Sequence, residues 1–171
     1  MEISTEMIKE LREQSGAGIM ECRNTLVTTE GDMDKAIQLL KEQGLLKAQK
    51  KAERATTQGI VEAYVHMGSR VGAMIELNCE TDFVARTAEF KELAHNLAMQ
   101  VAAMSPCYVA EGEVPAGADV DIKEVCLLLQ PYIKEPSQTI QDVITETVAR
   151  VGENIRVGRF VRYELGDSET E

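Results

Sequence analysis

Hydrophobic residues at the start of the chain recur at the spacing of amphipathic helices. Ile3, Met7 and Leu11 lie on one face of the first predicted helix. Two further helices show the same spacing, and their apolar positions in chain order are Ile19, Cys22, Leu26, Val27, Met33, Ala36, Ile37 and Leu40. Gly44 is expected to end the third helix, because glycine often supplies the left-handed residue after a helix. Residues 1–45 are therefore expected to form a three-helix head.

The next segment, residues 46–58, is the most basic stretch of the chain. It contains Lys47, Lys50, Lys51 and Arg54. One interpretation is a solvated linker, partly helical, between the head and the rest of the chain. The other is a local contact with an acidic face of a partner protein.

Beyond this linker the apolar period changes to two, which is the spacing of β-strands. Val61, Ala63 and Val65 alternate with other side chains, and a turn at residues 67–69 separates them from a second alternating run over residues 71–79. This pattern predicts a β-hairpin with one buried face.

The remaining residues predict helices and one more strand. A helix ends at residues 105–106, an irregular connection follows, a short helix ends at Pro131, and another helix runs from Thr139 to Gly152. The third strand covers residues 155–165.

Strict alternation along the third strand assigns its faces. It places Val157, Val161 and Tyr163 on one side, and it places Arg156, Phe160 and Arg162 on the face opposite the core. A three-stranded sheet also leaves two edges open unless a partner or a second copy covers them.

The predicted fold class is α+β, with a small antiparallel sheet packed against helices in a body over residues 59–165 and an acidic tail over residues 166–171. The chain has 171 residues and a net charge of −11, and 44% of its residues are hydrophobic. It can therefore bury a core. Acidity, absence of tryptophan and only 4% aromatic residues argue against nucleic-acid binding.

Nothing in the sequence predicts a secretion signal, a membrane span or a metal site. The N-terminus lacks a basic segment before an apolar run, and the purest aliphatic run is residues 127–129. The four cysteines, at positions 22, 79, 107 and 126, show no C-x-x-C spacing, and there are only two histidines. We expect a cytoplasmic protein with free thiols, no metal, no cofactor, and neither nucleic acid nor membrane as a partner.

Catalytic motifs are not evident either. The glycines at residues 16–18 join two helices, so they lack the strand–loop–helix context of a phosphate site. Cys79 and His95 could in principle pair as nucleophile and base, but structural roles explain both more simply. No residue is assigned a catalytic role.

The joint between the second strand and the following helix is the most informative segment. One interpretation is that Thr81 or Asp82 caps the helix and Phe83 staples it to the core. The other is a protruding Asp–Phe pair, an apolar wedge beside a carboxylate, that enters a groove of another protein. The residues alone leave both open.

Several segments resemble bacterial elongation factor Ts in the same order along the chain. They are LREQSGAGIMECRNTL, GDMDKAIQLLKEQG, KAQKKAER, NCETDFVAR, CLLLQPYI and VGENIRVGRFVRYELG. The resemblance covers about residues 1–165 and implies a guanine-nucleotide exchange factor for elongation factor Tu. It also implies that the head is a ubiquitin-associated-type bundle that grips the nucleotide-binding domain of that partner, with Ile19, Met20 and Arg23 in the contact.

The resemblance further implies how exchange occurs. Residues Thr81, Asp82, Phe83 and Val84 match the most distinctive motif of the family, which lies near the partner's Mg²⁺. Asp82 and Phe83 match the residues that wedge in and help to dislodge that ion. Val151 and Gly152 match a further contact segment.

Two features depart from longer members of the family. Only one strand–strand–helix set is present, which resembles the short form that forms a homodimer, and Phe160, Tyr163 or residues 60–66 could supply the interface. Only residues 117–124 separate blocks between which many members carry a helical excursion. The alternative to an exchange factor is a non-catalytic protein-interaction module with the same helical head.

Overall fold

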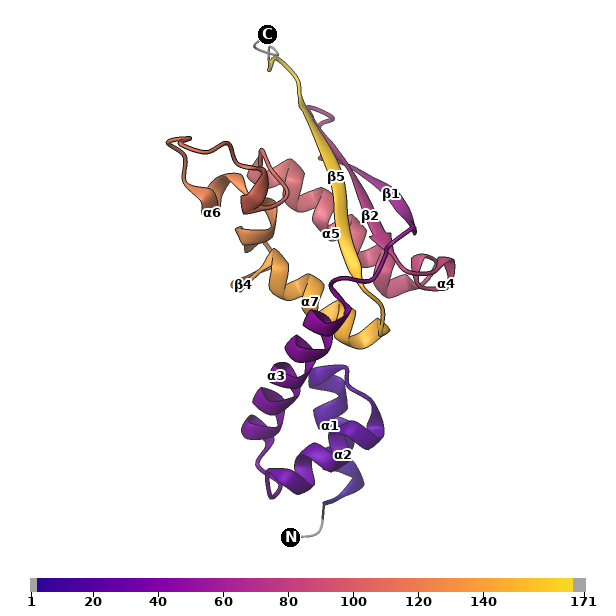
Figure 1. Ribbon diagram of the computed structural model, residues 1–171. Helices are drawn as coiled ribbons and strands as arrows, with labels where there is room; N and C mark the ends of the chain where they lie inside the picture. Colours follow the sequence, from indigo (N-terminus) through magenta and orange to yellow (C-terminus); the bar gives the residue numbers. More distant parts are fainter. Residues whose placement is uncertain (1–2, 168–171) are drawn as a thin grey trace.

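The head consists of three helices around a small apolar core at one end of the molecule (Figure 1). They are α1 (Thr5–Ser15), α2 (Ile19–Thr28) and α3 (Met33–Lys51) in the computed structural model, which describes residues 3–167. Their common core contains Leu11, Cys22, Leu26, Ala36 and Leu40. Ser4 caps α1 by accepting a hydrogen bond from the amide of the third helical residue, at 3.2 Å. The predicted three-helix bundle is confirmed.

Helix α3 does not end where the sequence pattern placed its end. The prediction that Gly44 stops the helix is wrong, because α3 continues for seven more residues to Lys51 and takes in the first half of the basic segment. A Cβ atom on Gly44 would lie 3.3 Å from the Cβ of Ala149 in α7 (Ile140–Val151). Glycine therefore serves here as a small contact residue between two helices, and α3 packs on α7.

The body contains a three-stranded antiparallel sheet covered on one face by a long helix (Figure 1). The strand order is β1 (Gln58–Val65), β2 (Val71–Cys79), β5 (Ile155–Glu164), so that β2 is central. The covering helix is α5 (Ala88–Met104), which contacts all three strands. The core between the sheet and its covering helices includes Ile75, Leu77, Phe90, Leu97, Val101 and Ile155. The predicted α+β class with a sheet packed against helices is confirmed.

A β-bulge in the third strand changes which residues face the core. Leu77 lies opposite Val157, and the next pair joins Glu76 to Arg159. Gly158 is therefore an extra residue in β5. A Cβ atom on Gly158 would lie 2.6 Å from Oδ1 of Asn78, so the bulge leaves no room for a side chain there.

The assignment of Phe160 to the face opposite the core is consequently wrong. Phe160 packs against the core, whereas Val161 and Tyr163 are exposed. Arg162 also turns inward, and its Nε donates to the carbonyl of Ala102 at 3.0 Å. Strict alternation failed because one extra residue moves every later side chain of a strand to the other face.

In β1 the alternating residues Val61, Ala63 and Val65 lie on the outer face. Val61 and Val65 are exposed, while Ile60 and Tyr64 pack against the core. His95 of α5 lies edge-on to the ring of Tyr64 and interacts with Glu62 at 3.0 Å. The contacts of His95 therefore attach α5 to the inner face of β1, which is a structural role.

The segment between α5 and α7 is irregular, as expected, but contains more short elements than its sequence pattern suggests. These are η1 (Glu111–Glu113), α6 (Ile122–Val125), η2 (Leu127–Leu129), β3 (Pro131–Tyr132) and β4 (Glu135–Thr139). The predicted short helix ends earlier than Pro131 because the chain becomes extended at Cys126. Two buried glutamines hold this segment on α5: Nε2 of Gln100 donates to Oε1 of Gln130 at 3.2 Å.

The four thiols are free, and Cys107 is the one that is exposed. Burial raises the pKa of Cys79 and of Cys126. Within residues 3–167, no helix combines the length and the apolar composition required to cross a membrane. Of the predicted acidic tail, residues 168–171 lie outside the described residues, and Leu165 and Gly166 form a turn after β5.

The close approach of β1 to β2 at Gly59 gives a stability prediction. A Cβ atom at this position would lie 2.2 Å from the carbonyl oxygen of Leu77. Gly59→Ala should therefore lower the free energy of unfolding by about 2–4 kcal/mol, measured by urea denaturation. Gly112→Ala is the control, since a Cβ atom there meets no atom within 4 Å. Equal denaturation midpoints for the two variants would contradict the prediction.

Candidate partner-binding site

A sharp corner joins β2 to a single helical turn, α4 (Asp82–Ala85). Thr81 is the N-cap of this turn, and its Oγ1 accepts a hydrogen bond from the amide of Val84 at 3.5 Å. A second threonine, Thr87, caps α5, so the strand and the long helix are joined by a separate element. Figure 1 shows α4 projecting from the edge of the body.

The four residues of this corner divide into two that face inward and two that face solvent. Val84 is buried, and Thr81 is bonded within the protein. Phe83 is 82% exposed. The carboxylate of Asp82 is half-exposed and pairs with Arg86 at 2.9 Å. The hydrophobic-staple interpretation of Phe83 is therefore wrong, because its ring makes no core contact.

Glu153, which lies between α7 and β5, forms hydrogen bonds with the corner. Its Oε2 accepts from the amide of Thr81 at 3.0 Å, and its Oε1 accepts from the Thr81 hydroxyl at 2.6 Å. In the opposite direction, Oε1 of Glu80 accepts from the amide of Asn154 at 2.7 Å. We call Glu80, Thr81, Glu153 and Asn154 the corner clasp. The sequence analysis missed Glu153, because residues 72 positions apart carry no local signal of their contact.

The clasp also reaches the end of α3. The buried side-chain amide of Asn154 donates to the carbonyls of Ala52 and Arg54, at 3.2 and 2.9 Å. Arg54 also lies 3.6 Å from the carboxylate of Glu80. Below the clasp, the thiol of Cys79 donates to the Thr81 carbonyl at 3.1 Å. Burial, followed by the Glu153 carboxylate, raises the pKa of this thiol, so it stays protonated and remains a donor.

Val151 and Gly152 lie at the C-terminal end of α7, directly before the clasp. Gly152 has φ +80° and ends the helix, and its amide donates to the Val148 carbonyl at 3.0 Å. The structure therefore brings this predicted contact segment next to Thr81, through the bonds that Glu153 makes.

The other predicted contact residues lie on the head. Ile19 and Met20 are 56% and 63% exposed at the start of α2, and Arg23 is exposed one turn later. Val27 extends the same outward face. Together they leave an apolar surface with one cation at its centre. Ile19 also borders a shallow hollow of about 210 Å³ against α1.

Comparisons with known proteins agree on one family. The model of the family described as elongation factor TS matches residues 2–119 and 119–167. The elongation factor Ts of Carboxydothermus hydrogenoformans is 46% identical, over 96% of this chain and 90% of the relative. That of Thermotoga maritima is 46% identical over 98% of both chains, and that of Thermodesulfovibrio yellowstonii is 44% identical over the full length of both.

The chain belongs to the elongation factor Ts family. Elongation factor Ts is the nucleotide exchange factor for elongation factor Tu in translation, and it acts without covalent chemistry. The family resemblance and the exchange-factor function predicted from the sequence are thereby confirmed.

The relatives carry residues that this chain lacks, and the connection between α5 and α6 in this chain covers residues 105–121. The alignments extend over 195 positions, more than the 171 residues of this chain. The two matched segments of the family model meet at residue 119, within that connection.

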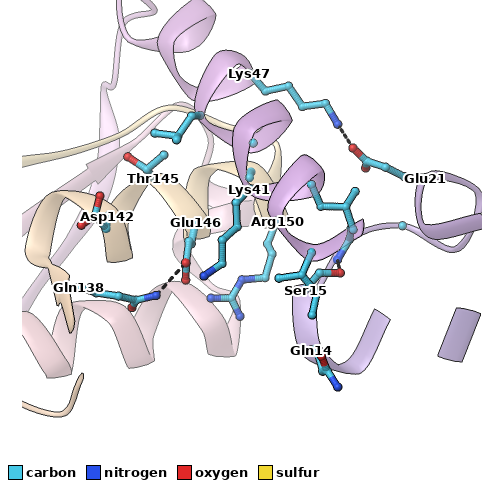
Figure 2. Close-up of a pocket in the computed structure, with 18 of the residues that line it drawn as sticks. Gln14, Ser15, Glu21, Lys41, Lys47, Gln138, Asp142, Thr145, Glu146 and Arg150 are labelled. Atoms are coloured by element: carbon cyan, nitrogen blue, oxygen red, sulfur yellow. Dashed lines mark hydrogen bonds and ion pairs between the residues drawn. The ribbon is translucent and has the colours of Figure 1, made fainter. Parts of the chain in front are cut away.

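A separate cleft lies between the head and α7 (Figure 2). Its volume is about 570 Å³, and Lys41, Glu146 and Arg150 line it. Figure 2 shows Glu146 bonded to Gln138 and Lys47 bonded to Glu21 across its rim. None of the corner residues Thr81 to Val84 lines this cleft. Within residues 3–167, no group of three or more His, Cys, Asp or Glu side chains is arranged to hold a metal ion.

The exposure of Phe83 predicts how the stability of the chain responds to removal of its ring. Phe83→Ala should change the free energy of unfolding by no more than about 0.5 kcal/mol, because the ring has few contacts to lose. Phe90→Ala is the matched comparison, since Phe90 is fully buried and its loss should cost about 3–5 kcal/mol. Chemical denaturation of both variants checks this, and a comparable loss in both would restore the staple interpretation.

Proposed function

We propose that this chain promotes nucleotide release by binding elongation factor Tu through two surfaces. The outward face of α2, with Ile19, Met20 and Arg23, holds the nucleotide-binding domain of the partner. The corner at α4 then inserts Asp82 and Phe83 beside the partner's Mg²⁺ and dislodges it, while the end of α7 at residues 151–152 adds a neighbouring contact. The observation that carries this proposal is the 82% exposure of Phe83 on a corner whose backbone is held by hydrogen bonds.

The roles within the corner differ. Phe83 and Asp82 are the two side chains that can reach a partner, because Val84 is buried and Thr81 is bonded to Glu153. Thr81 and Val84 therefore contribute by shaping the turn rather than by direct insertion. The Asp82 carboxylate pairs with the solvent-exposed Arg86, so it can turn toward a cation or the ligands of a cation.

Exchange requires the partner to bind this chain more tightly when its nucleotide is absent. Such coupling is reciprocal, so every interaction that weakens the nucleotide is weakened by it in turn. Burial of one phenylalanine contributes about 1.5–3 kcal/mol. Since about 1.4 kcal/mol corresponds to a tenfold change, Phe83 accounts for about a tenfold to hundredfold effect. Loss of Mg²⁺, which neutralises the phosphate charge, supplies a second and larger contribution.

The partners proposed for this chain are proteins, and neither nucleic acid nor a membrane is among them. The net charge of −11 opposes binding to nucleic acid or to an anionic membrane surface, and a translation factor of this kind acts in the cytoplasm.

Release of a fluorescent GDP from elongation factor Tu, followed by stopped flow, tests the mechanism. Phe83→Ala should lower the rate of release about tenfold to a hundredfold at a fixed concentration of this chain. Met67→Ala is the matched control, because Met67 is a 91% exposed apolar residue in the hairpin turn. Equal release rates for the two variants would refute the wedge role, and an interaction module would bind elongation factor Tu without accelerating release at all.

We also propose that the chain forms a homodimer through the outer face of its sheet. Two neighbouring rows of this face are apolar across all three strands, and the row beyond them carries the Glu76–Arg159 ion pair. In the first apolar row, Ala63 lies beside Met74, and Met74 lies beside Val161. In the next row, Val65 and Tyr163 flank Gly72, and both are more than 60% exposed. A two-fold pairing of identical faces would cover these side chains. Phe160 is not part of this interface, since it packs against the core.

Sedimentation equilibrium tests the dimer. The chain should sediment at about twice its mass of 18.9 kDa, and Tyr163→Asp should reduce this to the mass of one chain, because it places a charge in an apolar interface. Leu46→Asp is the control, since Leu46 is an exposed apolar residue of α3 on the head. A wild-type mass of 18.9 kDa at high micromolar concentration would show that the chain is active as a monomer if exchange persists.

A further inference from the structure

The position of Phe83 cannot come from its own packing. Its ring is exposed, and α4 is a single turn of four residues, too short to be stable by itself. The direction in which the ring points is therefore set by what holds the backbone of α4: the buried Val84 and Ala85 anchor its end, and a second contact holds its start. That backbone position is Thr81, two residues before Phe83.

Glu153 holds Thr81 at two atoms. One carboxylate oxygen takes the backbone amide and the other takes the hydroxyl, at 3.0 and 2.6 Å. The hydroxyl has one proton, which it gives to Glu153, and its lone pairs remain free to accept from the Val84 amide. The carboxylate thus orients the same oxygen that caps α4. A single hydrogen bond would fix a point, whereas this pair fixes both the backbone and the rotamer of Thr81.

The support for Glu153 is itself fixed. Glu153 follows the end of α7 and precedes β5, and its neighbour Asn154 is tied to Glu80 and to the carbonyls after α3. Three segments distant in sequence therefore meet beneath the corner. Glu153 lies between the helix that packs on α3 and the turn that carries Phe83.

We propose that Glu153 is a positioning residue for nucleotide exchange, which holds Thr81 so that Phe83 points into the partner; this rests on the proposed function of Phe83. Glu153 makes its contacts within the chain, and its effect passes through Thr81. Its loss should therefore leave the binding surface of the head unchanged and impair the step that follows docking.

The first test needs no partner. The chain contains no tryptophan, so Phe83→Trp introduces a single fluorescent reporter at the tip of the corner. In this background, Glu153→Ala should increase the fast, local component of the time-resolved anisotropy decay. Glu153→Gln, which keeps one carbonyl acceptor and the size of the side chain, should give an intermediate value. An unchanged decay in Glu153→Ala would overturn the proposal.

Asp142→Ala is a matched control in both tests. Asp142 takes the amide and the hydroxyl of Thr139, at 2.8 and 2.7 Å, at the other end of α7. The Asp142→Ala substitution therefore removes the same pair of hydrogen bonds from a capping threonine and leaves the contacts of the corner in place. The anisotropy decay of the reporter should not change in this variant, and an equal change would show that Glu153 acts only through general stability.

The second test measures GDP release from elongation factor Tu over a range of concentrations of the otherwise wild-type chain. Glu153→Ala should lower the maximal release rate about tenfold and shift the half-saturating concentration less than about twofold, with Glu153→Gln in between. Asp142→Ala should keep the wild-type rate. An unchanged maximal rate, or a rise in the half-saturating concentration alone, would overturn the positioning role. Failure of the wild-type chain to accelerate release would refute the proposed function, and the anisotropy decay would still decide whether Glu153 holds the corner.

Discussion

Burial of one face of the sheet against α5 is the interaction on which the other parts of the body depend. A three-stranded sheet with one covering helix has a single buried face, and its side chains must come from alternate positions of β1, β2 and β5. Because β2 is central, it supplies the most continuous buried series, from Ala73 to Cys79. The opposite face keeps two exposed apolar rows, Ala63–Met74–Val161 and Val65–Gly72–Tyr163, and these are the basis for the proposed homodimer.

This packing also determines where the corner can project. β2 ends at the buried Cys79, and α5 must begin on the covered face of the sheet. The chain therefore has to leave the end of this central strand and return within a few residues. The intervening turn, α4, uses Val84 to anchor itself and leaves Phe83 in solvent. Because the ring of Phe83 is exposed, it adds little to the free energy of unfolding and stays accessible to a partner.

The connection between head and body is held by packing and hydrogen bonds. α3 continues past Gly44 and packs on α7, and the buried amide of Asn154 binds the carbonyls that follow α3. The end of α7 is also where Glu153 begins to hold the corner. The two proposed contact surfaces, on α2 and at α4, are therefore joined by one packed path that runs through α3, α7 and the corner clasp.

Local pattern in the sequence determined the long helices and the three strands of the main sheet, and it identified the corner. The helical spacing of the head, the alternation in the hairpin and the cap at Thr81 depend on contacts within one turn or between adjacent strands, so the sequence pattern can indicate them. The motif around Phe83 was also recognisable, although its exposure was not. Three features were decided only by the tertiary structure. They are the continuation of α3 through Gly44, the exchange of the two faces of β5 after the bulge at Gly158, and the two hydrogen bonds between Glu153 and Thr81. Each depends on a contact between residues far apart in the chain, such as Gly44 with Ala149, and the free energy of that contact outweighs the local preference on which a sequence pattern is based.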